Sequence, residues 1–372
     1  MARAGSRGVR VVGGSRRGAR GLGGSGFPHW QPAVLRCGLV QRRQRQLARA
    51  DGADRRPAAD ARLAAAGRVG AACPVIRAAY LAADGFERQL AEELARLDVP
   101  VSAWHGRLAL SPEAPCEAAW ALDAWLAPQE MPAPSVGAAA DALRAIQRNW
   151  SLYAAGQFRR AALIEARLPP VRARPLRFPE PAPASHLGAW TLLAPDCMLL
   201  SPAKSSPFAR GECRFEEDRA GPPNRAYLKL WEALTRLGAW PRPGERCLDL
   251  GAAPGGWTWA LAKLGASVVA VDKAPLDPAV AAMPCVEWRR ESAFALEPGP
   301  VDWLVCDVVA YPRRLLGLVE RWMGAARRIV CTIKFQGATD HEAAAAFAAL
   351  PGGHVAHLWH NKHELTFSWQ AT

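Results

Sequence analysis

Two aspartates frame a glycine-rich turn and are the first side chains in the sequence with a clear chemical use. The stretch from Cys247 to Lys273 predicts a buried strand, a sharp turn, a helix over 257–264 and a second strand over 267–271. Asp249 precedes the turn, and Asp272 follows the second strand. An acid at this second position is placed to hydrogen-bond both hydroxyls of a ribose, as in dinucleotide-binding βαβ units. We therefore expect the unit to hold a nucleoside at the amino end of its helix.

The turn itself reads GAAPGG, and its glycines at 251, 255 and 256 let the backbone turn sharply and approach a ligand that a Cβ atom would exclude. Its spacing matches neither G-x-G-x-x-G, the pattern of dinucleotide sites, nor G-x-x-x-x-G-K-[ST], the pattern of triphosphate sites. The alternative is a tight structural turn in another kind of α/β protein. We favour a ligand site because the second acid follows one βαβ length later.

The string DLGAAPGGW, from Asp249 to Trp257, closely resembles the cofactor loop of the FtsJ-like family of RNA ribose 2′-O-methyltransferases. The resemblance implies an α/β, Rossmann-like domain over 219–372 that uses S-adenosylmethionine (SAM) as methyl donor. It also implies that loop 253–256 lies beside the methionine part of SAM, that Asp272 takes the ribose, and that segment 289–294 lies near the adenine. The implied cofactor-binding residues are Asp249, Gly251, Ala253, Pro254, Gly255, Gly256, Trp257, Asp272, Ser292 and Asp307.

The adenine segment departs from the family pattern at one position. It reads RRESAF here, whereas RlmM-type members of the family resemble it with R-E-D-G-F. Ser292 therefore stands where an aspartate would contact the adenine amino group. Ser292 can still accept a hydrogen bond, and Glu291 is the alternative acceptor. We expect one of the two to make this contact, at some cost in affinity for SAM.

Four further charged residues lie where an open α/β sheet gathers its ligand sites. Apolar strands end at Asp307 and Lys334. Glu364 enters a terminal strand, and a helix over 224–234 carries Lys229. Taken singly, each is more often a solvated surface charge. FtsJ-like enzymes have a Lys-Asp-Lys-Glu catalytic set in this order, and KLWEA around Lys229 resembles the helix that supplies its first member, so the resemblance implies that all four are catalytic.

Methyl transfer to a ribose gives each of the four a task. A 2′-hydroxyl is a poor nucleophile, so its proton must be removed while its oxygen lies in line with the methyl carbon. We expect Lys334 to be the general base, which requires desolvation or a nearby cation, and Lys229 can be that cation. Asp307 would orient the Lys334 amine, whereas Lys229 and Glu364 would position the hydroxyl and stabilise its developing charge. The reaction needs no metal, and none of the spacings offers a metal site.

The positive charge of the chain is concentrated at its N-terminus. Residues 1–73 hold 15 arginines and three aspartates, whereas the remaining residues hold 32 basic and 31 acidic side chains. Because this first segment is rich in arginine, glycine and alanine without an apolar period, we expect a disordered extension. It has three interpretations: a basic tail that contacts RNA, an organelle transit peptide, or an upstream extension that is not part of the natural protein, which we favour. Any RNA binding by the remainder must come from a local patch.

Residues 75–218 are expected to form an accessory α+β domain that binds RNA. A strand after Val75, a helix over 86–97, two short strands around His105-Gly106 and a helix over 116–126 predict a ferredoxin-like start. A proline-rich link, further helix to about residue 150 and a hairpin over 191–203 follow. The order resembles the N-terminal RNA-binding region of RlmM-type enzymes, although this region is shorter here.

A run of arginines interleaved with aromatic and proline residues interrupts this region. Its members are Arg159, Arg160, Arg167, Arg172, Arg174 and Arg177. Arginines pair with phosphates while rings stack on bases, so the run suits an RNA surface. A solvated linker stiffened by proline is the equal alternative.

The cysteines and the apolar runs bear on the compartment. The nine cysteines show no C-x-x-C spacing, and we interpret them as reduced, mostly buried thiols of a cytoplasmic protein. They are Cys37, Cys73, Cys116, Cys197, Cys213, Cys247, Cys285, Cys306 and Cys331. No apolar run approaches the roughly 20 residues that cross a bilayer. We expect a monomer that binds neither a metal nor a membrane.

Within the FtsJ-like family, the N-terminal region, PGGWTW and the ending LWHNKHELTF most resemble the RlmM-type branch, whose members modify a cytidine ribose in 23S rRNA. The resemblance implies SAM-dependent 2′-O-methylation of 23S rRNA, either free or in a pre-ribosomal particle. Three alternatives remain: a 2′-O-methyltransferase for another RNA, a SAM enzyme that acts on a protein or small molecule, and an RNA-binding protein of the same fold without catalysis.

Overall fold

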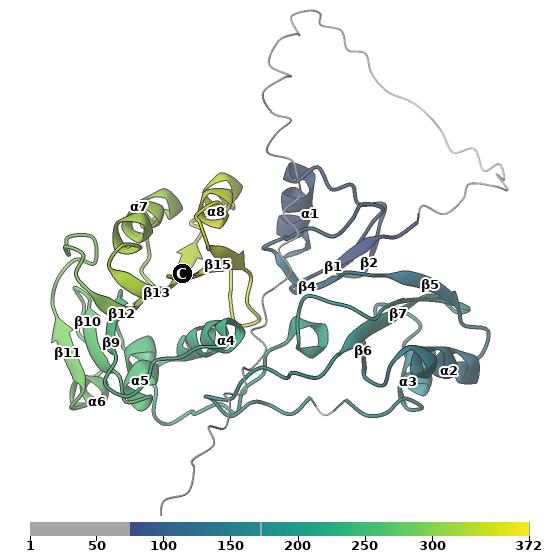
Figure 1. Ribbon diagram of the computed structural model, residues 1–372, viewed down its shortest axis with the longest axis horizontal. Helices are drawn as coiled ribbons and strands as arrows, with labels where there is room; N and C mark the ends of the chain where they lie inside the picture. Colours follow the sequence, from purple (N-terminus) through teal and green to yellow (C-terminus); the bar gives the residue numbers. More distant parts are fainter. Residues whose placement is uncertain (1–74, 172, 372) are drawn as a thin grey trace, which may run out of the picture. The chain divides into compact units, whose positions relative to one another are not determined.

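The computed structural model describes residues 75–171 and 173–371 (Figure 1). Segment 1–73, which the sequence predicts to be a disordered extension, lies outside these residues. The described part contains three sheets, and the largest of them lies in the C-terminal half of the chain. This sheet positions the candidate site.

The C-terminal sheet has seven strands in the order β11-β10-β9-β12-β13-β15-β14. Neighbours from β11 to β13 are parallel, whereas the last strand, β15, is antiparallel to β13 and β14. The strands are β9 (Arg246–Leu250), β10 (Ser267–Val271), β11 (Val286–Arg289), β12 (Val301–Cys306), β13 (Ala326–Lys334), β14 (His354–Ala356) and β15 (Glu364–Gln370). The helices are α4 (Tyr227–Leu237), α5 (Gly256–Lys263), α6 (Pro278–Ala281), α7 (Pro312–Trp322) and α8 (His341–Ala348).

Helices cover both faces of this sheet. Successive residues of a strand point in opposite directions, so each strand places side chains under the helices of both faces. Cys247 of β9 is buried on the face where α4 and α5 pack, together with Leu261. The next residue, Leu248, is buried on the opposite face with Leu315 of α7 and Phe347 of α8 (Figure 1). A mostly parallel sheet covered on both faces explains the nearly continuous apolar runs of its strands. The predicted Rossmann-like α/β domain is confirmed.

The N-terminal half contains two four-stranded sheets, with strand orders β2-β3-β1-β4 and β5-β8-β7-β6. The first is built from β1 (Ala78–Ala82), α1 (Glu87–Arg96), β2 (Ala103–His105), β3 (Leu108–Ser111) and β4 (Ala121–Trp125). The second is built from β5 (Gln129–Pro132), α2 (Val136–Ile146), β6 (Trp150–Leu152), α3 (Phe158–Glu165), β7 (Gly188–Ala194) and β8 (Cys197–Ser201), followed by a 3₁₀ turn at Ala209–Gly211. The helix expected over 86–97 and the hairpin expected over 191–203 are present as α1 and as β7 with β8.

The helix predicted over 116–126 is wrong, because its second half is strand β4. Apolar residues fill nearly every position of CEAAWALDAWL, so a helical period cannot be told from a buried strand. Antiparallel pairing with β1 decides for the strand. The pairing also buries Asp123, whose carboxylate accepts a hydrogen bond from Lys204 Nζ at 2.8 Å. The proline-rich link also differs from expectation, since it contributes β5, which pairs with β8.

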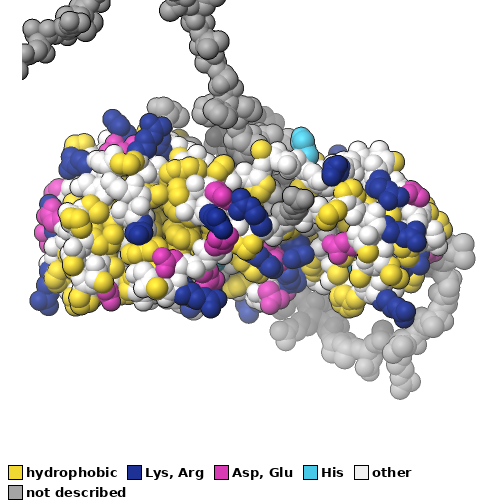
Figure 2. Space-filling model, turned by 90° about the horizontal axis from the view of Figure 1, so that it is seen from below, with side chains coloured by type: hydrophobic (Ala, Val, Ile, Leu, Met, Phe, Trp, Pro, Cys, Tyr) yellow, Lys and Arg dark blue, Asp and Glu magenta, His cyan; other side chains and the backbone are white. Residues whose placement is uncertain are grey.

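Charges on the surface of the described part are mixed in sign. On the face seen in Figure 2, lysine and arginine side chains are interspersed with aspartate and glutamate. Within the arginine run, Arg174 pairs with Glu180 at 3.0 Å and Arg177 with Glu216 at 2.8 Å. Among residues 75–171 and 173–371, no helix is long and apolar enough to span a bilayer.

Candidate active site

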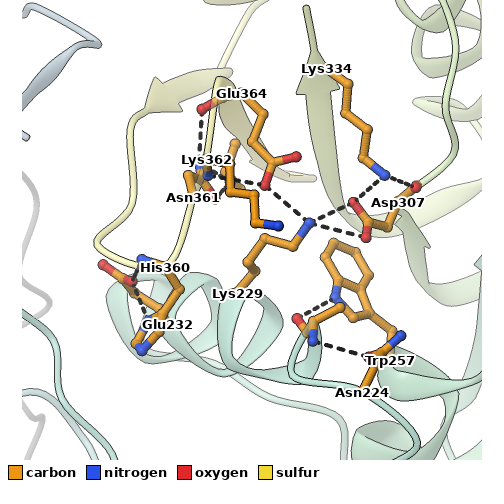
Figure 3. A network of polar contacts seen from close by, with 12 residues as sticks. Asn224, Lys229, Glu232, Trp257, Asp307, Lys334, His360, Asn361, Lys362 and Glu364 are labelled. Atoms are coloured by element: carbon orange, nitrogen blue, oxygen red, sulfur yellow. Dashed lines mark hydrogen bonds and ion pairs between the residues drawn. The ribbon is translucent and has the colours of Figure 1, made fainter. Parts of the chain in front are cut away.

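Four side chains from different elements meet at one edge of the C-terminal sheet (Figure 3). Lys229 Nζ lies 2.9 and 3.1 Å from the two carboxylate oxygens of Asp307 and 3.1 Å from Glu364 Oε1. Lys334 Nζ lies 3.0 Å from Asp307 Oδ1 and also donates to the backbone carbonyl of Asp307. The structure therefore brings together the four residues that the sequence predicts to be catalytic.

The topology of the sheet explains this convergence. Asp307 directly follows β12 and Lys334 ends β13, and the carboxyl ends of neighbouring parallel strands meet at the same edge. Glu364 begins β15, which runs the other way, and it pairs directly with Lys334 in the β13–β15 register. Lys229 reaches the same point from α4. Three strand ends and one helix thus contribute one charged group each.

The four groups are mostly shielded from solvent, with side-chain exposures between 9% and 20%. Burial acts against the charged form of Lys229, but the carboxylates of Asp307 and Glu364 outweigh it and raise the pKa of Lys229 above its ordinary value. Lys229 therefore stays a cation at neutral pH. Lys229 binds both carboxylate oxygens of Asp307. Lys334 therefore shares the Asp307 carboxylate with a second positive charge.

The glycine-rich turn lies at the same edge, between β9 and α5. Gly251 has a φ of +76°, and a Cβ atom there would lie 2.7 Å from the backbone Cα of Val308, the residue after Asp307. A Cβ atom on Gly256 would meet the amide oxygen of Asn224. These glycines are thus required for packing within the protein, in addition to any approach of a ligand.

Asp272 follows β10 and lies beside this turn. Its carboxylate accepts hydrogen bonds from the backbone N–H groups of Ala253 at 3.1 Å and Ala274 at 2.9 Å. The first bond ties Asp272 to the glycine-rich turn. Each carboxylate oxygen keeps a further lone pair. Asp272 can therefore still receive a ribose hydroxyl, as the sequence predicts.

Asp249, the last but one residue of β9, is completely buried. Its Oδ2 accepts a hydrogen bond from Thr258 Oγ1 at 2.7 Å, but its Oδ1 has no hydrogen-bond partner among the described residues. Burial raises its pKa to about 7, with a smaller rise from the charges of Asp307 and Asp272 and against the bond from Thr258. A buried oxygen without a donor beside the turn fits a ligand that supplies one.

The segment expected near the adenine comes at the end of β11, which pairs with β10, the strand that precedes Asp272. Within it Ser292 is half-buried and Glu291 is exposed. Helix α7 holds the end of this segment, because the Arg314 guanidinium lies 3.9 Å from the Phe294 ring centroid and Arg321 donates to the carbonyl of Leu296 at 2.8 Å. The side chain of Trp257 is buried, and its Nε1 donates to the carbonyl of Ala226 at the start of α4 at 2.8 Å (Figure 3). Its indole therefore supports the helix that carries Lys229.

Glu232 is a site residue that the sequence analysis did not single out. It is completely buried one helical turn after Lys229, and it ties α4 to the loop that precedes Glu364. Its carboxylate accepts bonds from Arg236 Nε at 2.8 Å, Trp359 N and His360 N at 3.0 Å, and His360 Nδ1 at 2.8 Å (Figure 3). Burial would raise its pKa, but Arg236 and His360 outweigh burial and lower it. The KLWEA motif contained the signal, because residues three apart share a helix face.

An aromatic cluster joins the N-terminal half of the described part to the converging residues. Phe335 follows Lys334, and its ring centroid lies 5.9 Å from that of Trp120. His363 precedes Glu364, and its ring lies 5.9 Å from the same tryptophan. The backbone N–H of His357 donates to the carbonyl of Ala119 at 2.6 Å. The segment before β4 thus packs behind two of the four converging residues.

The thiols and acids of the described residues show no other reactive cluster. Burial raises the pKa of Cys306 to about 12 and raises that of Cys331 as well, so both thiols stay protonated. No group of three or more His, Cys, Asp and Glu side chains among the described residues is arranged to hold a metal ion.

Comparisons with known proteins point to one family. Residues 222–344 match the family model described as FtsJ-like methyltransferase. Proteins named ribosomal RNA large subunit methyltransferase M are similar to this chain. The one from Halorhodospira halophila is 43% identical over 155 residues, which cover 39% of this chain and 46% of that protein. The one from Aromatoleum aromaticum is 40% identical over 162 residues (38% and 44%), and the one from Alkalilimnicola ehrlichii is 38% identical over 189 residues (46% and 52%).

The chain thus spans about half the length of the curated relatives that it matches. The matched residues include the glycine-rich turn, three of the four converging side chains and the seven-stranded sheet up to β13. The match to the FtsJ-like methyltransferase model thus covers most of the C-terminal sheet and ends before β14 and β15.

Proposed function

We propose that this protein transfers a methyl group from SAM to a ribose 2′-hydroxyl of 23S rRNA, on a cytidine. The observation that carries the proposal is the convergence of Lys229, Asp307, Lys334 and Glu364 beside the glycine-rich turn of a methyltransferase domain. The names of the three relatives support ribosomal RNA as the substrate class.

The residues at the sheet edge fit the methyl donor. Asp272 would hold its ribose, and the free Oδ1 of buried Asp249 would accept a hydrogen bond from its amino group, directly or through water. The turn from Gly251 to Gly256 would lie beside its methionine part, and Ser292 or Glu291 near its adenine. When bound, SAM supplies an electrophilic methyl carbon on a sulfonium centre.

Lys334 would remove the proton from the 2′-hydroxyl as the hydroxyl oxygen attacks the methyl carbon of SAM. The base must be a neutral amine at that moment, and Lys334 shares the carboxylate of Asp307 with the cation of Lys229. Lys229, held by Asp307 and Glu364, would then face the oxygen on which negative charge develops. Asp307 orients both amines, through its carboxylate and its carbonyl.

The direct test measures methyl transfer from labelled SAM to unmodified 23S rRNA and maps the product for 2′-O-methylribose. Because a general base contributes about 100-fold or more, Lys334→Ala should lower kcat by at least that factor. The matched control is Lys263→Ala, which removes an exposed lysine at the far end of α5. Transfer at the wild-type rate by Lys334→Ala would refute the proposed base, and a methyl group on a base or a protein would refute the reaction.

The accessory region, residues 75–218, is proposed to hold the rRNA. In its favour, Phe158 and Arg159 of α3 are both exposed, which pairs a ring with a cation on one short helix. A double Phe158→Ala, Arg159→Ala variant should bind 23S rRNA more weakly in a filter assay. Assaying naked rRNA and pre-ribosomal particles in parallel identifies which of them is the substrate. We further propose that the protein is cytoplasmic and that it is a monomer. Light scattering of the purified protein can check the monomeric state.

A further inference from the structure

Two apolar side chains are exposed in the segment that joins Asp307 to α7. Val309 is 70% exposed and Tyr311 is 69% exposed. Among the large apolar side chains of the described residues, only Val75, where the described part begins, is more exposed than these two. Isolated exposed apolar residues are ordinary on protein surfaces, so it is the location of this pair that matters. Both follow Asp307 within four residues.

The backbone holds the two side chains in place. Asp307 N donates to Leu250 O at 3.1 Å, which fixes one end of the segment to the sheet. Tyr311 precedes Pro312 at the start of α7, and its carbonyl accepts a bond from Leu315 N at 3.1 Å. Ala310 between them is buried. Since four extended residues span at most about 14 Å, the Tyr311 backbone lies within that distance of Asp307.

The neighbouring charges favour a polyanion over an apolar partner. Arg313 is exposed and pairs only at the surface with Glu342, at 3.0 Å, where both side chains are about three-quarters exposed. Such a pair contributes little and leaves the guanidinium available for a phosphate. An exposed ring beside an available arginine, at the edge of a proposed ribose site, matches how unpaired bases are bound.

We infer that Tyr311, together with Val309, is a stacking platform for an unpaired nucleobase next to the methylated ribose. The inference rests on the proposed function and deepens it, because a base within a duplex has both faces covered and could not stack there. The substrate segment at the site is therefore single-stranded. Base stacking on an aromatic ring is tolerant of sequence, so the platform orients the strand without selecting the nucleotide.

Binding of RNA, measured apart from methyl transfer, tests the platform. Filter binding of the full chain to unmodified 23S rRNA is compared for wild type, Tyr311→Phe, Tyr311→Leu and Tyr311→Ala. Phe keeps the ring, whereas Leu keeps apolar area without a flat face. We expect wild-type affinity for Tyr311→Phe and a loss of about 10-fold for the other two, with unchanged affinity for SAM by calorimetry.

Direct binding of two labelled homopolymers separates stacking from phosphate contacts. Single-stranded poly(C) should bind Tyr311→Ala about 10-fold more weakly than wild type, whereas the duplex poly(I)·poly(C) should bind both equally. Wild-type affinity in Tyr311→Ala or in Tyr311→Leu overturns the inference, as does absence of rRNA binding by the wild type. Binding that depends on the ring without any methyl transfer supports the platform and refutes the proposed reaction instead.

Discussion

Removing the carboxylate of Glu232 should destabilise the fold and lower activity without touching any of the four converging side chains. Glu232 is completely buried and accepts four hydrogen bonds, two of them from the backbone of Trp359 and His360. The remaining two come from the side chains of Arg236 and His360. Glu232→Ala leaves all these donors without an acceptor, and Glu232→Gln removes only the charge and one acceptor oxygen.

The structure gives the expected magnitude. Breaking a buried ion pair by removing one partner costs about 3–5 kcal/mol. Hydrogen bonds to a charged group contribute about 1.5–3 kcal/mol each, but their losses overlap with the loss of the pair. We expect Glu232→Ala to lose about 4 kcal/mol of unfolding free energy and Glu232→Gln about 2 kcal/mol. Against a typical total of about 5–15 kcal/mol, either loss is easily measured.

Urea unfolding followed by tryptophan fluorescence measures these losses, with Glu342→Gln as control. Glu342 pairs with Arg313 at the exposed surface, so its change should lie within about 0.5 kcal/mol of zero. The folded-state pKa of Glu232 is lowered below its ordinary value of 4.5, so its contribution is present above that pH and is lost as the pH falls through the folded pKa. The difference between wild type and Glu232→Gln should shrink accordingly in acid. A stability loss below 1 kcal/mol for Glu232→Ala, or one that does not depend on pH for Glu232→Gln, would refute the assigned role.

Three further changes are open to the same measurements. Gly251→Ala should cost about 1–3 kcal/mol more than Gly244→Ala, since both have positive φ but only the first Cβ would meet Val308; equal losses in urea unfolding contradict the packing argument. The raised pKa of Asp249 means that the folded state holds a proton there, so stability should fall as the pH rises from about 4 to about 7. Asp249→Asn should flatten the dependence of stability on pH, and an unaltered dependence would contradict the raised pKa assigned to Asp249. Trp120→Ala should lower the free energy of unfolding by about 3–5 kcal/mol. Because Trp120 packs behind Phe335 and His363, it should also lower kcat at a temperature where the variant is folded, and an unchanged kcat would show that this packing does not affect catalysis.

The converging residues could be predicted because open α/β sheets follow few rules. Strand β10 lies where the sequence predicts it, at 267–271, and Lys334 and Glu364 lie at strand ends as expected. Once strands and helices alternate, the carboxyl ends of the parallel strands must share an edge. Resemblance then supplied the roles that periodicity alone cannot give.

Other features depend on partners that are distant in the sequence. Glu232 and Trp359 are 127 positions apart in the sequence, so the reason for a buried acid in α4 cannot be found locally. The atom that a Cβ on Gly251 would meet belongs to Val308, which no local pattern reveals. For residues 121–125, the helical preference of alanine and leucine is overridden by pairing with β1. Local sequence signals fail where tertiary contacts make the choice.

The order of strands has a consequence for the chain as it leaves the ribosome. β15 is synthesised after β13 and β14 but lies between them, and β14 forms its ladder with β15 alone among the described strands. Until β15 emerges, β14 has no strand to pair with among the described strands, and Lys229 lacks one of its two anions. The four converging side chains therefore cannot all come together before β15 has been synthesised. Nascent or truncated chains that end before residue 364 should be inactive even when the rest of the sheet has formed.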